Sequence, residues 1–231
     1  MSFRTEEYIR SPGGKQRGAT LIVVMLVLVV LTVLGVSAMR MGLSNLNVAT
    51  NSQVGNLLYQ SSDAGLYYLM RLDPLKEAVP GGALAVVNLP GREDMFCMRM
   101  KGATPSLKAG VCDPAVTDDF MSGRNAVLTQ VYVKSSQIDT APTLGNDLDN
   151  LNQSLTMTST AVLPAFGSAT TATIKGCLAL PGDDTVAGKL ANGSIYYYED
   201  PAVVSASECL TTNGAIFTTL VEDVQIVREL K

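Results

Sequence analysis

The chain has 231 residues and a net charge of −4, with 47% hydrophobic residues, 16% charged residues and no histidine. A charged fraction this far below the usual value of about a quarter indicates surface that is buried in a membrane or an assembly. The acidic balance argues against a nucleic-acid partner. Without histidine, Ser-His-Asp and Cys-His catalysis and imidazole metal sites are excluded. We therefore expect no catalytic residue, no metal and no cofactor, and no enzyme.

A charge-free stretch runs from Gly18 to Met39, between Arg17 and Arg40. A helix needs about 20 apolar residues to cross a bilayer, so this stretch predicts one membrane span. Basic residues outnumber acidic ones in residues 1–17. That excess predicts that the N-terminus stays in the cytoplasm and that the rest of the chain lies on the other side of the membrane.

Two processing events compete at this segment. An ordinary signal peptidase would cut after Ala38, where residues 36–38 have the required small-x-small pattern, but the apolar region is longer than the usual stretch of about 7–15 residues. The alternative cut, between Gly18 and Ala19, keeps the apolar helix on the mature protein. A basic leader that ends in Gly18 and is followed directly by a long apolar helix resembles the class III signal of type IV pilins and pseudopilins.

The resemblance extends along the helix. Residues 31–40 and 49–65 are similar to the N-terminal region of PilX-type minor pilins, with Asp63 where the family tends to have Glu. The similarity covers about residues 17–72. It implies that a prepilin peptidase removes the leader 1–18 and methylates the amine of Ala19. It also implies partners: the major pilin, other minor pilins and a tip adhesin.

One departure from the pilin pattern concerns the fifth residue of the mature chain. Major pilins have a Glu there, which in the family picture neutralises the N-terminal amine of a neighbouring subunit, whereas this chain has Val23. A buried amine without a counter-charge costs several kcal/mol, so a subunit without the Glu is poorly suited to repeat along a filament. Val23 therefore favours a position at the filament tip, a property shared with the K-type tip pseudopilins of type II secretion.

The helix is expected to continue beyond the membrane to Leu72 and to end at Asp73-Pro74, because proline lacks the amide donor and restricts the residue before it. Residues 19–39 would be the transmembrane part and residues 40–73 the periplasmic part. One stripe of the periplasmic part should face a partner surface. Its expected members are Leu43, Leu46, Thr50, Val54, Leu57, Ser61, Gly65, Tyr68 and Leu72.

Residues 74–231 are expected to form a β-rich globular head. Their β-branched and aromatic runs, bounded by turn residues, predict an antiparallel sheet packed on the helix, which is the α+β roll that the pilin resemblance implies. The expected strands are residues 84–89, 95–101, 127–135, 155–163, 171–180 and 194–198, followed by one or two strands in 216–230. Residues 136–154 and 181–193 are expected to be loops.

All four cysteines lie on the non-cytoplasmic side of the span, where disulfides persist. Three connectivities are open. We expect pairing between sequence neighbours, Cys97 with Cys112 and Cys177 with Cys209. Zinc is not expected, because the spacing contains no Cys-x-x-Cys.

Two further motifs have competing interpretations. Residues 146–152 have Asp-x-Asp character but lack the third ligand and the glycine of an EF-hand loop, which favours a solvated loop. The run Tyr196-Tyr197-Tyr198 is either a partner surface or a strand whose aromatics are half buried.

The leading hypothesis is a minor pilin that primes type IV pilus assembly at or near the tip, held first in the bacterial inner membrane with a periplasmic head and then displayed on the pilus. The alternatives are a K-like tip pseudopilin, which would have an inserted helical domain, and a single-pass, membrane-anchored periplasmic ligand-binding protein. The position along the pilus, and whether the pilus serves motility, adhesion or DNA uptake, stay open.

Overall fold

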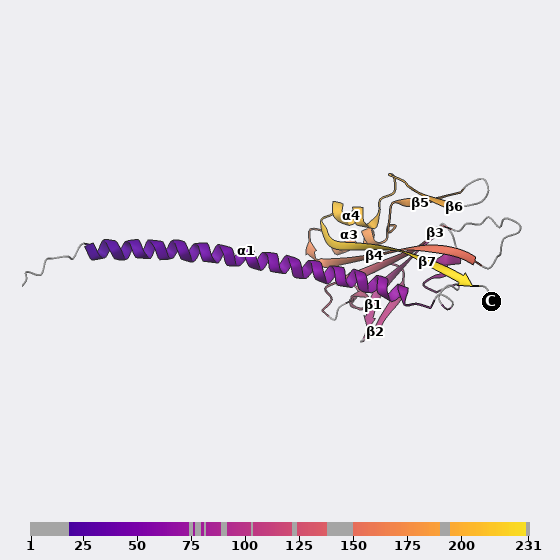
Figure 1. Cartoon of the computed structure of the whole chain (residues 1–231), viewed down its shortest axis with the longest axis horizontal. Coiled ribbons are helices and arrows are strands. Elements are labelled where there is room, and N and C mark those ends of the chain that lie inside the picture. The colour runs from indigo at the N-terminus through magenta and orange to yellow at the C-terminus, as the bar shows by residue number, and fades with distance from the viewer. Residues whose placement is uncertain are drawn as a thin grey trace, which may run out of the picture. The chain divides into compact units, whose positions relative to one another are not determined.

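The longest element is helix α1, which runs from Ala19 to Met70 in the computed structural model (Figure 1). The structure describes residues 19–73, 76, 80, 82–88, 92–102, 104–121, 124–137, 150–189 and 195–229. The chain divides into two units, Met1–Ser52 and Gln53–Lys231. The described part of the first unit is helix alone, and the second unit contains the rest of α1 and the head.

Helix α1 ends two residues before the expected Leu72. The amide of Arg71 donates to the carbonyls of both Tyr67 and Tyr68 at 3.3 Å, and the amide of Leu72 donates to the carbonyl of Leu69 at 3.1 Å. The bonds to Tyr68 and Leu69 go to the third residue back, so they tighten the last turn and satisfy carbonyls near the helix end. The helix therefore ends in a tightened turn ahead of Asp73, and residues 71–73 are not its continuation.

The head is built on one five-stranded antiparallel sheet with strand order β2-β1-β3-β4-β7. Its strands are β1 (Glu93–Lys101), β2 (Thr104–Ala109), β3 (Leu128–Gln137), β4 (Asn150–Gly167) and β7 (Ala215–Glu229). The longest ladder joins β4 to β7, from Leu163 opposite Ile216 to Asn150 opposite Glu229. Together with α1 this confirms the expected α+β pilin-like fold.

The two faces of the sheet have different coverings. Side chains alternate along a strand, so Val131 and Val133 of β3 point to one face and pack with Leu66 and Leu69 of α1. Leu128 points to the opposite face and belongs to a second cluster, which contains Ile174, Leu178 and Leu210 of two short helices. The sheet is thus the middle layer between the C-terminal part of α1 and helices α3 (Thr171–Leu178) and α4 (Ala206–Thr212).

The strand expected over residues 171–180 is wrong, because this segment forms helix α3. Thr170 is its N-cap, and the hydroxyl of Thr170 accepts a hydrogen bond from the amide of Thr173 at 3.2 Å. The buried residues Ile174, Cys177 and Leu178 recur at helical spacing. The β-branched residues in this stretch predicted a strand, but the cap and the burial of this face decide for a helix.

The strand expected over residues 84–89 is also wrong. Residues Ala85–Asn88 form a 3₁₀ turn, η1, which begins with a hydrogen bond from the amide of Ala85 to the carbonyl of Gly82. Leu84 and Val86 are buried in the cluster beneath α1. Their apolar character reflects burial of a turn in the core and not pairing in a sheet.

A separate two-stranded hairpin consists of β5 (Thr185–Lys189) and β6 (Ile195–Glu199). Strand β6 was expected, whereas β5 lies in a segment that was expected to be a loop. Strand β2 and helix α4 were not expected either. Of the one or two strands expected in residues 216–230, the structure has one, Ala215–Glu229. Residues 138–149, which include most of the Asp-x-Asp motif, lie outside the described residues.

Candidate functional site: an exposed assembly helix and a disulfide-bonded head

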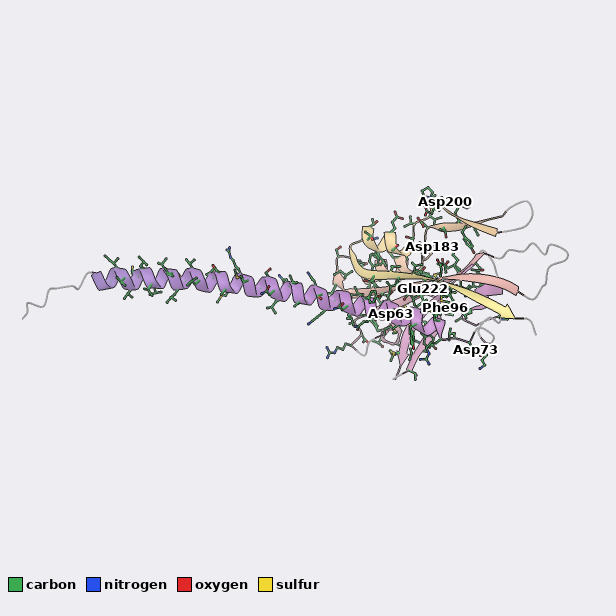
Figure 2. The ribbon with its side chains drawn as sticks, viewed as in Figure 1. Asp63, Asp73, Phe96, Asp183, Asp200 and Glu222 are labelled. Carbon is green, nitrogen blue, oxygen red and sulfur yellow. A yellow bond between two sulfur atoms is a disulfide. The ribbon has the colours of Figure 1, made fainter. Side chains whose placement is uncertain are left out.

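The N-terminal part of α1 is apolar on all sides and has no protein cover. The large hydrophobic side chains between Leu21 and Val48 are each at least 47% exposed, and Figure 2 shows side chains projecting from all around the helix. By length and composition, α1 is the one helix among the described residues that can cross a membrane. Exposing this much apolar surface to water is unfavourable, so the helix needs lipid or other helices around it.

The predicted processing site lies at the beginning of this helix. Gly18 is outside the described residues, and Ala19 is the first residue of α1. Val23 is 60% exposed, and the first turn of the helix contains no acidic residue. The helix therefore presents an apolar side chain at Val23, the predicted position of the pilin Glu.

Within the second unit, α1 lies close to the sheet at Gly65. A Cβ on Gly65 would lie 2.5 Å from the Ser159 hydroxyl and 3.2 Å from methyl carbons of Thr129 and Val131. The hydroxyl of Ser62, one turn earlier, donates to the carbonyl of Ser159 at 2.5 Å. The absence of a side chain at position 65 therefore allows the helix and β4 to approach to this distance.

The expected stripe on α1 is partly wrong in phase. Leu57 is 39% exposed, whereas its neighbour Leu58 is 2% exposed and packs with Val127 and Leu163. Gly65 does lie on the buried face, with Leu69 one turn later. Val54, Tyr68 and Leu72 also pack against the head, as the stripe predicts, and the stripe omits the fully buried leucines beside them.

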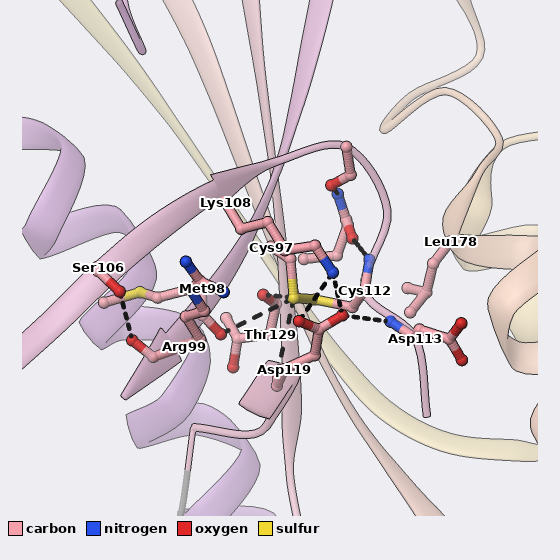
Figure 3. The surroundings of a disulfide bond; sticks show 12 residues. Cys97, Met98, Arg99, Ser106, Lys108, Cys112, Asp113, Asp119, Thr129 and Leu178 are labelled. Atoms are coloured by element: carbon pink, nitrogen blue, oxygen red, sulfur yellow. Dashed lines mark hydrogen bonds and ion pairs between the residues drawn. A yellow bond between two sulfur atoms is a disulfide. The ribbon is translucent and has the colours of Figure 1, made fainter. Parts of the chain in front are cut away.

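The cysteines form two disulfides, Cys97–Cys112 and Cys177–Cys209, which is the pairing expected between sequence neighbours. The first connects β1 to the segment that follows β2 (Figure 3), and the second joins α3 to α4. Both lie in the cluster on the sheet face opposite α1. They hold the covering segments of this face to one another and to the sheet.

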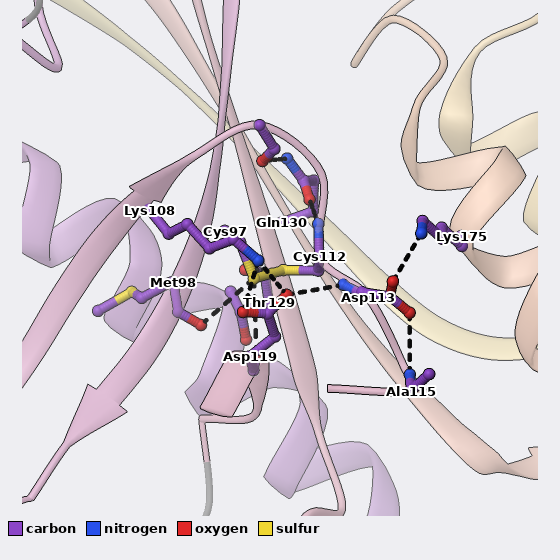
Figure 4. A network of polar contacts seen from close by, with 11 residues as sticks. Cys97, Met98, Lys108, Cys112, Asp113, Ala115, Asp119, Thr129, Gln130 and Lys175 are labelled. Atoms are coloured by element: carbon purple, nitrogen blue, oxygen red, sulfur yellow. Dashed lines mark hydrogen bonds and ion pairs between the residues drawn. A yellow bond between two sulfur atoms is a disulfide. The ribbon is translucent and has the colours of Figure 1, made fainter. Parts of the chain in front are cut away.

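A buried acidic residue organises the turn beside the first disulfide. Asp119 is fully buried, and its carboxylate accepts from the Lys108 ammonium at 2.7 and 2.9 Å and from the backbone amide of Asp113 at 2.9 Å. Figure 4 shows these contacts converging next to Cys97 and Cys112. No sequence signal points to this group, because Lys108 and Asp119 belong to different elements and neither stands in a motif.

The network continues to α3 through Asp113. Its carboxylate accepts from the Lys175 ammonium at 2.6 Å and from the amide of Ala115 at 2.9 Å (Figure 4). These hydrogen bonds, with that from Lys175 the stronger influence, lower the pKa of Asp113. The ion pair links the turn after β2 to α3 across the surface of the head.

An apolar groove of about 430 Å³ lies in the second unit between the end of α1 and the β1–β2 edge of the sheet. Its walls include Tyr67 and Tyr68 of the helix and Met98 and Met100 of β1. Among the described residues, no group of three or more acidic or cysteine side chains is placed to hold a metal ion.

An apolar N-terminal helix that continues into the core of an antiparallel, disulfide-bonded head defines a pilin-like protein. The family model described as PilX N-terminal matches residues 17–66. This similarity to PilX-type pilins, over a segment of the chain, suggests a minor pilin of a type IV pilus, which is a structural protein. Comparisons with curated proteins and with solved structures gave no match.

Proposed function

We propose that the chain is a minor pilin that primes type IV pilus assembly at or near the filament tip. The observation that carries the proposal is the apolar start of α1: the matched segment brings a pilin-type helix, and Val23 replaces the Glu of major pilins. A subunit without this carboxylate leaves the amine of a subunit above it unpaired, at a cost of several kcal/mol. At the tip no subunit lies above, so the cost does not arise.

The proposed parts follow from this role. A prepilin peptidase removes residues 1–18 and methylates Ala19; residues 19–39 anchor the protein in the inner membrane and then dock among pilin helices. Residues 40–70 extend this helix into the head, residues 74–231. The head lies in the periplasm before assembly, which is consistent with its two disulfides. Other minor pilins, the major pilin and a tip adhesin are the proposed partners.

The K-like alternative has less support. That class has an inserted helical domain, whereas α3 and α4, the helices of the described part of the head beyond α1, have eight and seven residues. A plain membrane-anchored protein would need no cut after Gly18. The mass of the N-terminal peptide from native cells separates these classes: a start at Ala19 with one added methyl supports a pilin or pseudopilin, and a start at Met1 or Met39 contradicts both.

A pair of neighbouring substitutions tests the tip position. Val23→Glu supplies the missing carboxylate and should let labelled subunits repeat along the filament, whereas unsubstituted subunits should label filament ends. Val24→Glu is the matched control, because Val24 is 58% exposed against 60% for Val23 and lies one residue out of register. Immunogold labelling of purified filaments measures the distribution. End labelling that is unchanged by Val23→Glu, or shaft labelling by the unsubstituted protein, contradicts the proposal.

A further inference from the structure

The β5–β6 hairpin stands outside the main sheet, and one buried lysine joins the two. Lys134 of β3 is 8% exposed, and its ammonium donates to a carboxylate oxygen of Asp183 and to the carbonyl oxygen of Thr185, each at 2.8 Å, and also to the Thr185 hydroxyl. Three acceptors match the three protons of the ammonium group. The ammonium also lies 4.6 Å from the centre of the Tyr197 ring on β6. Lys134 therefore fastens both strands of the hairpin to β3.

A carboxyl group lies under the same hairpin. Glu93 of β1 stands opposite Lys134 in the strand register, and a carboxyl oxygen of Glu93 accepts from the amide of Gly182 at 2.9 Å. Glu93 and Lys134 line a cavity of about 270 Å³, which Tyr197 and Thr185 enclose from the hairpin side. The position of Asp183 on the segment leading into β5 is labelled in Figure 2.

Burial, the largest influence, and the nearby Asp183 raise the pKa of Glu93, whereas the Gly182 amide and Lys134 lower it, and the net result is a pKa of about 7 instead of 4.5. Burial alone would raise the pKa of Asp183 too, but its hydrogen bonds from Lys134 and Thr185 outweigh burial and lower that pKa. The groups that face Glu93 are Lys134 and Tyr132 from β3, Asp183 from the segment before β5 and Tyr197 from β6. The Lys134 ammonium thus interacts with two carboxyl groups, those of Glu93 and Asp183.

The base of the hairpin is fixed independently. The Tyr132 hydroxyl donates to the carbonyl of Leu178 at 3.0 Å, and a Cβ on Gly182 would lie 2.8 Å from the Tyr132 ring. The amide of Ala206 donates to the carbonyl of Pro181 at 2.8 Å. These contacts hold the segment before β5 in place without Lys134.

We propose that the β5–β6 hairpin is a pH-responsive flap, which is closed over the sheet while the Glu93 carboxyl is protonated and opens when that carboxyl ionises. Ionisation puts a second negative charge beside Asp183 at a half-buried position, and opening exposes the carboxylate fully to water. Opening also uncovers Lys134 and the Tyr197 ring. The flap does not depend on the pilus assignment, because every group involved belongs to the head.

The direction and size of the pH effect on flap opening follow from the difference in Glu93 pKa between the closed and open forms. Between pH 4.5 and about 7 the closed form keeps the proton on Glu93 while the open form, with the ordinary value of 4.5, has lost it. Each rise in pH through this range therefore favours the open form, and the effect levels off above pH 7. From these two values, the ratio of open to closed flap rises about 70-fold between pH 5 and pH 8.

Hydrogen exchange measured by mass spectrometry on the full chain in detergent micelles tests the flap, with labelling times scaled for the pH dependence of chemical exchange. We expect the protection of residues 185–189 and 195–199 to fall by about 70-fold between pH 5 and pH 8, while that of β3 and β4 stays constant. Glu93→Gln keeps an acceptor for the Gly182 amide but cannot ionise, so its hairpin protection should not change with pH. Glu208→Gln, at an exposed carboxyl on α4, is the matched control and should behave as the unsubstituted protein.

Three results would overturn the flap. The first is hairpin protection in the unsubstituted protein that does not change with pH, a measurement that needs no variant. The second is a pH profile that Glu93→Gln leaves in place. The third is a parallel loss of protection in β3 and β4, which means that the whole head loosens. A Lys134→Met variant adds a check of the fastening itself: its hairpin should exchange rapidly at both pH values.

Discussion

The contact between α1 and the sheet at Gly65 predicts that substitution by alanine has opposite effects on stability at two glycines of this helix. A Cβ added to Gly55 would meet no neighbouring atom within 4 Å, whereas a Cβ added to Gly65 would lie 2.5 Å from the Ser159 hydroxyl. Replacing glycine by alanine in an exposed helix stabilises it by about 1 kcal/mol. Overpacking a filled core costs about 1–3 kcal/mol, which offsets or exceeds that gain.

We therefore expect Gly55→Ala to leave the head as stable as before or more stable by up to about 1 kcal/mol, and Gly65→Ala to lower its stability by up to about 2 kcal/mol. The assay is urea unfolding of the full chain in detergent micelles with disulfides intact, followed by near-ultraviolet circular dichroism of the tyrosines, which reports on the head. Equal stability of the two variants, or a more stable Gly65→Ala protein, would refute the close approach of helix and sheet.

A second substitution identifies the atom responsible. The Ser159 hydroxyl is buried and has no hydrogen-bond partner among the described residues, so Ser159→Ala should cost little by itself. In the double variant with Gly65→Ala, removal of that oxygen should recover part of the loss, leaving only the 3.2 Å contacts with Thr129 and Val131. A strictly additive double-mutant cycle would show that the hydroxyl is not the obstacle.

Two further predictions concern the opposite face of the sheet. Asp119→Ala removes the acceptor for the Lys108 ammonium and the Asp113 amide, so we expect it to lower the free energy of unfolding by about 2–4 kcal/mol. The control Asp118→Ala, at an exposed neighbour, should change the free energy of unfolding by less than about 0.5 kcal/mol. Similar urea midpoints for the two variants would contradict the role of Asp119. Replacing both cysteines of a disulfide by alanine should lower the free energy of unfolding, by about 3 kcal/mol for Cys97–Cys112 and by about 4 kcal/mol for Cys177–Cys209. The second loss is larger because the sequence separations are 15 and 32. A larger loss for Cys97–Cys112 would show that loop length does not set the two contributions.

The sequence predicted the elements whose signal is long or chemically specific. A charge-free run of apolar residues leaves few alternatives to the first half of α1, and cysteines on one side of a membrane span indicate disulfides. The sequence also predicted strands β1, β3 and β4 and the final strand β7, although β4 extends well beyond the expected 155–163. Strands β3 and β4 are buried on both faces, so their continuous β-branched and apolar composition, and not an alternation, is the signal that the sequence carries.

The remaining elements depend on contacts that periodicity does not encode. Thr171–Leu178 has strand-like composition, but the Thr170 cap and the burial of Ile174 and Cys177 favour a helix. The hairpin strand β5 contains Gly188 and has the composition of a loop, but it pairs with β6 along its length and Thr185 accepts from Lys134, which its own sequence does not indicate. Glu93 and Lys134 meet only through the register of β1 and β3, so no local pattern could identify the site that they form.

The order of the strands along the chain has a consequence for the route by which the head is made. The β1–β2 hairpin and its disulfide join residues that are close in sequence, so they can form as soon as that stretch of the chain is available to fold. The ladder between β4 and β7 must wait until α3, both hairpin strands and α4 have also emerged, because all of them lie between the two strands. Until then the long β4 has one open edge, and an incomplete chain would expose it to other chains. This interval is therefore the stage of folding at which the head most needs protection from aggregation.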